Sequence, residues 1–147
     1  MSDSRRSNEA WEALLSAHAA LMKRFGAENI WQTVSMREYD VLYTLSKCQD
    51  PIRISDLNRH VLLSQPALSR LVQRLATRGM IASSADGADG RGVLVWITEA
   101  GRQLQRTIGR QHARGVAQAM TAALSRDEIR ELEAICLKLA RKGVAGS

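Results

Sequence analysis

Three regularly spaced arginines with no acidic neighbours are the first residues that suggest a chemistry. Between Leu57 and Ala85 the sequence contains no Asp or Glu, and it contains Arg70, Arg74 and Arg78. A spacing of four residues places these side chains along one side of a helix, where they repel each other mildly and attract an anion. A solvated helix face is the plain alternative. The residues at the start of the same helix favour an anion-binding face over a solvated one.

The start of the same helix carries side chains that suit the edges of DNA bases. Ser64 is expected to be the N-cap, and the free N–H groups of a helix start attract phosphate. Gln65 and Gln73 can pair with adenine, as arginine does with guanine. Ala67 is small enough to approach a thymine methyl group, and Ser69 adds a polar group. A cap alone is the plain interpretation of Ser64; we expect it to serve both purposes.

A glycine-rich segment beyond this helix places one more arginine at an exposed tip. Two β-favouring runs, 81–84 and 93–97, flank a segment that contains Asp89-Gly90-Arg91-Gly92. An arginine at the tip of such a hairpin can enter the narrow minor groove of DNA, where the negative potential is focused. Asp89 can hold Arg91 in an extended conformation. An ordinary polar turn is the alternative.

The hydrophobic periodicity and the turn residues predict a mainly helical chain with one hairpin. Helices are expected over residues 9–25, 36–47, 54–60, 65–78, 98–124 and 126–142, with Gly143 closing the last one, and strands over 81–84 and 93–97. Ser35 and Ser125 each stand three residues before a glutamate, which is the pattern of a capping box. Two short helices followed by a hairpin form a winged helix-turn-helix.

The first helix and the last helix each carry an apolar stripe. In the first helix the stripe includes Trp11, Leu14 and Leu21, and in the last helix it includes Leu132 and Leu139. Such helices are not stable alone in water, because most helical stability comes from packing of the apolar face. They therefore need each other or a second copy of the chain.

Composition limits the possible functions. The 147 residues carry a net charge of +6 with 45% hydrophobic residues, so the chain can bury a core and tends to meet polyanions. No run of about 20 apolar residues and no leader segment is visible, so we expect a cytoplasmic protein that binds no membrane. No catalytic motif, cofactor motif or metal-ligand spacing is present either, so we expect neither an enzyme nor a cofactor or metal.

The combined pattern resembles the MarR family of bacterial regulators. The resemblance rests on Ile54–Leu57, on Leu63–Leu75 and on Gly79-Met80-Ile81. It continues through Asp89-Gly90-Arg91-Gly92 and Ile97-Thr98-Glu99-Ala100-Gly101, so the order of elements matches over nearly the whole chain. Each segment alone is a weak signal, whereas the combination is quite specific.

The resemblance implies a homodimeric transcription regulator, a repressor in our interpretation, that binds a palindromic operator in double-stranded DNA. Residues 1–34 and 99–147 would form the dimerisation region, and residues 35–98 the DNA-binding domain. Arg91 would reach the minor groove with Asp89 orienting it. The residues that would face the major groove or its phosphates are Gln65, Ser69, Arg70, Gln73 and Arg74.

Two positions depart from the family pattern. Asn58 stands where such proteins usually have a small alanine that packs inward, so the first helix of the motif is expected to shift or to bond locally. The first wing strand has Ala82-Ser83-Ser84 where the family often has an arginine, so one phosphate contact is expected to be missing.

Many members of this family release DNA when a small aromatic anion binds. The residues that would line such an effector site are His18, Trp31, Arg37 and Tyr39. Two other functions stay open. A thiol switch would use Cys48, which follows Lys47, because Cys136 lies on the apolar face of the last helix. A winged helix that pairs with another protein, without specific DNA binding, is the third possibility.

Overall fold

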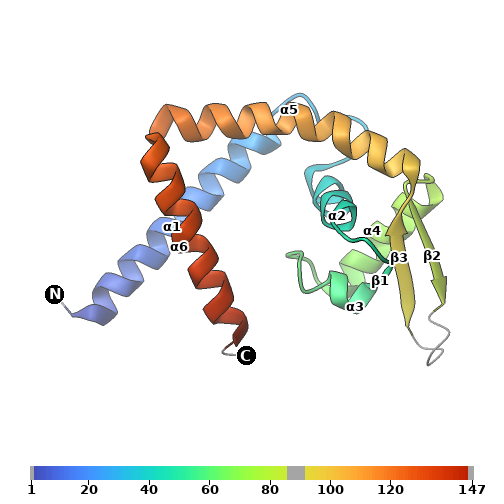
Figure 1. Ribbon diagram of the computed structural model, residues 1–147, viewed down its shortest axis with the longest axis horizontal. Helices are drawn as coiled ribbons and strands as arrows, with labels where there is room; N and C mark the ends of the chain where they lie inside the picture. Colours follow the sequence, from blue (N-terminus) through green and yellow to red (C-terminus); the bar gives the residue numbers. More distant parts are fainter. Residues whose placement is uncertain (1, 86–91, 146–147) are drawn as a thin grey trace. The chain divides into compact units, whose positions relative to one another are not determined.

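The computed structural model describes residues 2–85 and 92–145. The elements are α1 (Asp3–Gly26), α2 (Met36–Ser46), β1 (Ile52–Arg53), α3 (Ile54–Leu57), α4 (Gln65–Thr77), β2 (Ile81–Ala85), β3 (Val93–Ile97), α5 (Glu99–Ala123) and α6 (Arg126–Ala145) (Figure 1). The fold is a mainly helical winged helix-turn-helix with additional terminal helices, as predicted. Within the described residues, no helix is both long and apolar enough to span a membrane.

The chain divides into two compact units. The winged-helix unit is Glu28–Gln111, and the terminal unit combines Met1–Ala27 with His112–Ser147. The sequence predicts domain limits at 34/35 and 98/99. In the structure the winged-helix unit extends to Gln111, so the first half of α5 lies in this unit rather than with the terminal helices. The reason is packing: Ile108 of α5 is 4% exposed and belongs to the same hydrophobic cluster as Tyr39 and Leu42.

Local sequence signals set most of the helix starts. The Ser35 hydroxyl accepts the Glu38 N–H at 3.1 Å, and the Glu38 carboxylate accepts the Ser35 N–H at 2.8 Å. Ser125 and Glu128 form the same reciprocal pair at 2.9 and 3.2 Å. Both capping boxes predicted from the sequence are therefore confirmed.

The expected end of the last helix is wrong. Helix α6 continues through Gly143 to Ala145. A glycine inside a helix costs only about 1 kcal/mol relative to alanine. A single glycine without a following breaker therefore does not stop a helix.

The wing is the hairpin of strands β2 and β3, seen side by side in Figure 1. The two strands are antiparallel, with Ile81 opposite Ile97 and Ala85 opposite Val93. Strand β1, which the sequence did not predict, pairs with the other edge of β3 and gives the sheet order β1-β3-β2. A strand of two residues has no detectable alternation, so only the tertiary fold reveals it.

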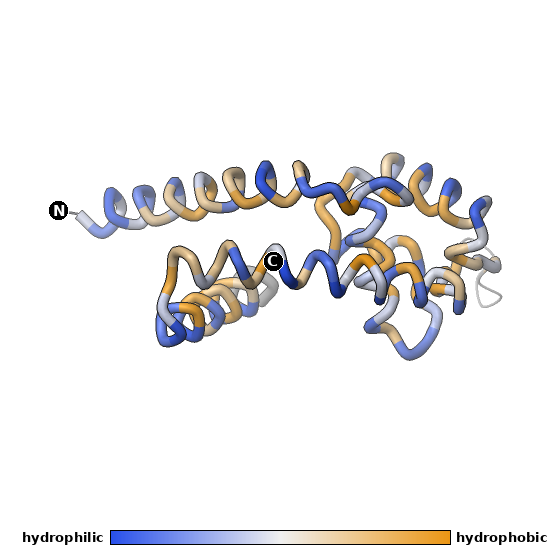
Figure 2. Tube along the Cα trace, turned by 90° about the horizontal axis from the view of Figure 1, so that it is seen from above, coloured by the Kyte–Doolittle hydropathy of each residue, from blue (hydrophilic) through white to orange (hydrophobic). Residues whose placement is uncertain are grey.

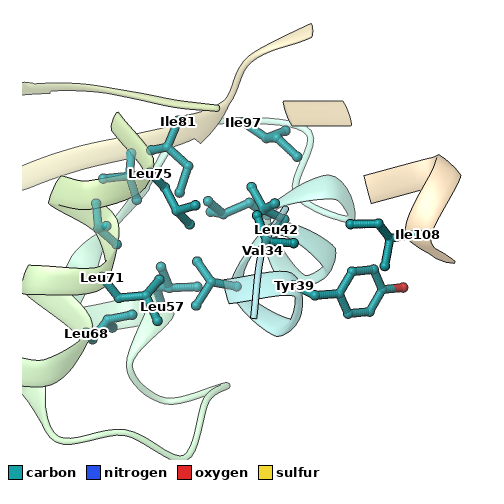
Figure 3. Packing of buried hydrophobic residues seen from close by; sticks show 14 residues of the cluster. Val34, Tyr39, Leu42, Leu57, Leu68, Leu71, Leu75, Ile81, Ile97 and Ile108 are labelled. Carbon is teal, nitrogen blue, oxygen red and sulfur yellow. The ribbon is translucent and has the colours of Figure 1, made fainter. Parts of the chain in front are cut away.

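The core of the winged-helix unit lies between α2, α3, α4 and the sheet. Its fully buried side chains include Leu42, Leu57, Leu68, Leu75 and Val95, and Figure 3 shows α4 and α2 directing theirs toward one another. Burial of each such leucine or valine contributes roughly 1.5–3 kcal/mol. Because one face of α4 is committed to this core, the opposite face is left to solvent.

A tight junction connects the end of α4, the base of the wing and the start of α5. Gly79 follows α4 with φ +78°, a conformation that favours glycine. The Thr98 hydroxyl donates to the Gly79 carbonyl at 2.6 Å and accepts the Gly101 N–H at 3.1 Å. The Thr98 N–H donates to the Met80 carbonyl at 3.1 Å. Thr98 therefore caps α5, as expected, and also holds the wing in place.

The terminal unit leaves much apolar surface uncovered. Phe25 is buried and its ring meets His112 edge-on at 5.3 Å, but Trp11 is 56% exposed and Ile135 is 58% exposed. Hydrophobic and hydrophilic residues alternate along α1, the helix that begins at the label N in Figure 2. The apolar stripes predicted from the sequence are thus present and largely exposed in a single chain.

The position that departs from the family pattern gives a stability prediction. The Asn58 Oδ1 atom is buried and has no hydrogen-bond partner among the described residues. Asn58→Ala should raise the free energy of unfolding by about 1 kcal/mol, because a buried unsatisfied polar atom costs about 1–3 kcal/mol. Urea denaturation followed by circular dichroism measures the change.

The matched control for this substitution is Asn29→Ala. The exposed Asn29 Oδ1 accepts a hydrogen bond from Gln32 at 2.8 Å, so its loss should be neutral or slightly destabilising. A lower stability for Asn58→Ala than for the wild type would contradict the interpretation of Asn58 Oδ1 as an unsatisfied buried atom.

Candidate nucleic-acid interface

Helix α4 presents a continuous polar face to solvent. Leu68, Leu71, Val72 and Leu75 are buried, which leaves the opposite side of the helix exposed. Its exposed residues include the set singled out from the sequence, Gln65, Ser69, Arg70, Gln73 and Arg74. The Ser64 hydroxyl accepts the Ala67 N–H at 3.3 Å and so caps the helix. No acidic residue belongs to this face, which therefore carries amides, hydroxyls and positive charge.

Arg78 does not belong to the basic stripe, contrary to the expectation from its spacing. Helix α4 ends at Thr77, and the Arg78 guanidinium donates to the carbonyl of Thr33. Its Nη1 atom also lies 3.9 Å from a carboxylate oxygen of Glu38. Because this acidic partner, Glu38, lies on α2 and far away in the sequence, the residues next to Arg78 give no sign of it. Arg78 ties α4 to the start of α2.

A groove runs from the start of α4 toward the wing. It has a volume of about 200 Å³ and is lined by Arg53, Ile54, Ser55, Gln65, Ser69, Gly92 and Val93. Gln65 and Ser69 are thus brought together with the start of β3, at the end of the wing away from α5. Arg53 and Ser55 are additional polar residues that the sequence analysis did not assign to DNA. Their only signal is their position at the start of α3, the first helix of the helix-turn-helix. Asp89 and Arg91 lie outside the described residues.

A second hollow, here called the arginine pocket, lies between α4 and the start of α2. It has a volume of about 200 Å³ and is lined by Ser35, Arg37, Leu63, Ala67, Arg70, Leu71 and Arg74. Its charged lining is cationic, and half-buried Ala67 forms part of its wall. The structure therefore groups Arg37 with the face of α4.

The candidate effector residues belong to both compact units. Tyr39 is 6% exposed and contacts Trp31 at a ring distance of 5.6 Å. Burial raises the pKa of the Tyr39 hydroxyl above its ordinary value, and a hydrogen bond with the Gln105 side chain opposes this effect. His18 is exposed in the terminal unit, and Arg37 lines the arginine pocket. Within the winged-helix unit, Trp31 and Tyr39 are direct neighbours.

The two cysteines are free thiols in different surroundings. Cys48 is half-buried and its Sγ donates to the Thr44 carbonyl at 3.4 Å. The preceding Lys47 directs its ammonium over the Tyr43 ring, 4.4 Å from the centroid. Cys136 is exposed in the single chain. Among the described residues, no three His, Cys, Asp or Glu side chains are grouped in a way that could hold a metal ion.

Comparison with known proteins identifies the segment that carries this face. Residues 32–92, from just before α2 to the end of the hairpin connection, match the model of the MarR family. The sequence has no significant match among curated proteins.

Solved structures share the fold of nearly the whole chain. AbsC, a MarR family transcriptional regulator from Streptomyces coelicolor, is 23% identical with a TM-score of 0.77, over 100% of this chain and 98% of that chain. Sco3205, a MarR family regulator from the same organism solved in complex with DNA, is 20% identical with a TM-score of 0.77, over 94% and 88%. BpsR of Bordetella bronchiseptica, whose DNA binding is regulated by 6-hydroxynicotinic acid, is 23% identical with a TM-score of 0.70, over 87% and 98%.

Proposed function

We propose that this chain, whose winged helix-turn-helix belongs to the MarR family, is a sequence-specific DNA-binding transcription regulator that acts as a homodimer. The observation that carries the proposal is the face of α4, which is exposed, free of acidic residues and lined by amide and guanidinium groups. A helix with these groups fits the major groove, where they can read base edges. The chain acts by binding rather than by catalysis.

The division of labour along α4 follows from the chemistry of the side chains. Gln65 and Gln73 suit paired hydrogen bonds to adenine, and Arg70 and Arg74 suit guanine or phosphate. Gln65 also lines the groove beside Gly92 and Val93 of the wing, which supports simultaneous contact of α4 and the wing with one DNA segment. In this proposal Arg91 enters the minor groove and Asp89 orients it.

The homodimer is supported by the exposed apolar stripes of the terminal helices. Contiguous apolar residues on the surface of a single chain indicate a partner surface. A two-fold dimer presents two α4 helices to two half-sites about one helical turn apart, so the operator should be roughly palindromic. A dimer placed over a promoter would act as a repressor.

Fluorescence anisotropy with labelled DNA from immediately upstream of the protein's own gene tests the proposal. The wild type should prefer this DNA to unrelated DNA. The double substitution Gln65→Ala/Gln73→Ala should lower that preference on the order of a thousandfold or more, because it removes two base-reading contacts in each protomer, worth about 1–3 kcal/mol each. Binding to unrelated DNA should hardly change, since neither residue is charged.

Gln103→Ala is the matched control, because Gln103 is an exposed glutamine on α5. It should retain the full preference. Equal and weak binding of the wild type to upstream and unrelated DNA would refute operator recognition. In that case an association with an acidic protein that hardly depends on salt would favour the protein-interaction module.

Release of DNA by a small aromatic anion is the regulatory part of the proposal. It is supported by the half-buried Trp31, which contacts Tyr39 and leaves part of an aromatic surface accessible. A panel of phenolic carboxylates added to the anisotropy assay should contain a compound that releases the operator. Release by a mild oxidant, abolished in Cys48→Ser, would instead favour the thiol switch.

A further inference from the structure

The arginine pocket is formed by two helices, α2 and α4, that lie far apart in the sequence. Arg70 and Arg74 project from α4, and Arg37 projects from the first turn of α2. All three side chains are exposed, and none forms an ion pair within the described part of the chain. Other arginines behave differently: Arg59 lies near Asp56, and Arg106 lies near Glu99.

The carboxylate next to Arg37 in the sequence is already engaged. Glu38 accepts the Ser35 N–H at 2.8 Å, and its other oxygen lies 3.9 Å from the Arg78 guanidinium. The pocket also borders the N-terminus of α2, whose partial positive charge adds to that of the guanidinium groups. Three like charges around one hollow are unfavourable unless an anion is shared among them, and a guanidinium fork fits a phosphate group with two hydrogen bonds.

We propose that the arginine pocket holds one phosphate group of the DNA backbone, and that Arg37 is the anchor contributed by α2. This inference rests on the proposed function, and it assigns Arg37 to DNA rather than to an effector. The hollow between α2 and α4 has room for a single phosphate-sized anion, at about 200 Å³. Arg37 positions α4 on the duplex without reading its sequence.

The salt dependence of DNA binding tests the role of Arg37. Arg37→Gln should lower the affinity for upstream and unrelated DNA by the same factor, on the order of tenfold at low salt. The slope of log K against log salt should become shallower by about two, one unit for each protomer. The ratio of the two affinities should not change, because a phosphate contact carries no sequence information.

Arg114→Gln is the charge-matched control, because Arg114 is exposed on α5 and lies outside the pocket. It should leave the slope unchanged. A wild-type slope in Arg37→Gln would overturn the proposal, and a loss confined to upstream DNA would overturn it as well. Failure of the proposed function is recognised separately, because the wild type would then show no preference for upstream DNA.

Free phosphate is the other source of the same chemical group. Inorganic phosphate at constant ionic strength should compete only weakly with DNA. If the wild type binds inorganic phosphate, Arg37→Gln does not, and the salt slope on DNA is the same in both, the occupant is a free anion. That combination would overturn the assignment to the DNA backbone.

Discussion

Gly101→Ala should destabilise the winged-helix unit by about 3 kcal/mol, at the upper end of the usual cost of overpacking. A Cβ atom at this position would lie 2.2 Å from the Met80 carbonyl oxygen and 2.8 Å from Cγ1 of Ile97. The carbonyl cannot move freely, because it accepts the Thr98 N–H at 3.1 Å. The added methyl group must therefore separate α5 from the base of the wing.

Urea denaturation measures this effect, and Gly109→Ala on the same helix is the control. A Cβ atom at Gly109 would approach Gln105 Nε2 and the Tyr39 hydroxyl at 3.1 Å each. The Gln105 amide is the end of a flexible side chain, and alanine gains about 1 kcal/mol over glycine inside a helix. Gly109→Ala should therefore be nearly neutral. Equal midpoints for the two variants would show that the junction tolerates the methyl group.

This junction also gives a physical reason for the motif Ile97-Thr98-Glu99-Ala100-Gly101, which the sequence shows only as a resemblance to the family. The spacing of Thr98 and Gly101 brings a capping hydroxyl to the Gly101 N–H, while the absent side chain lets α5 approach the Met80 carbonyl. The wing is consequently fixed at its base by hydrogen bonds, independently of its tip. A fixed base is what allows a hairpin tip to be directed at a groove of DNA.

Local patterns predicted most of the helices because the forces behind them are local. The apolar spacing in α4 follows the helical period, so its buried and exposed faces could be assigned residue by residue. The capping boxes at Ser35 and Ser125 involve groups three residues apart, and the structure confirms both. The sequence alone therefore indicates which residues of α4 face solvent.

Interactions between distant segments could not be predicted in this way. Arg78 leaves the basic stripe because Glu38 and Thr33 lie next to it only in the folded chain. The resemblance groups Arg37 with the residues of an effector site. Its place beside Arg70 in the lining of the arginine pocket depends on the packing of α2 against α4, which the sequence does not reveal. Tyr39 suggests a ligand contact by its aromatic ring, but its sequence position does not indicate that its side chain is buried or that it bonds to Gln105.

Ile135→Glu should convert the proposed dimer into a monomer. Ile135 is 58% exposed in the single chain and continues the apolar stripe of α6 beyond half-buried Leu132. In a two-fold interface each substitution occurs twice, so two carboxylates would be desolvated together, at a cost of several kcal/mol. Sedimentation equilibrium should show the dimer dissociation constant rising by more than about a hundredfold, since 1.4 kcal/mol is a factor of ten.

Leu62→Glu separates this effect from a general loss of apolar surface. Leu62 is 92% exposed in the turn between α3 and α4, outside the terminal helices, so its substitution should leave the dimer intact. Operator binding should fall steeply in Ile135→Glu, because a monomer engages one half-site and loses the gain from simultaneous contact with the second. A dimeric Ile135→Glu would mean that this stripe is not the interface. A monomeric wild type that still prefers upstream DNA would separate DNA recognition from dimerisation, and the two halves of the proposal would then stand on different residues.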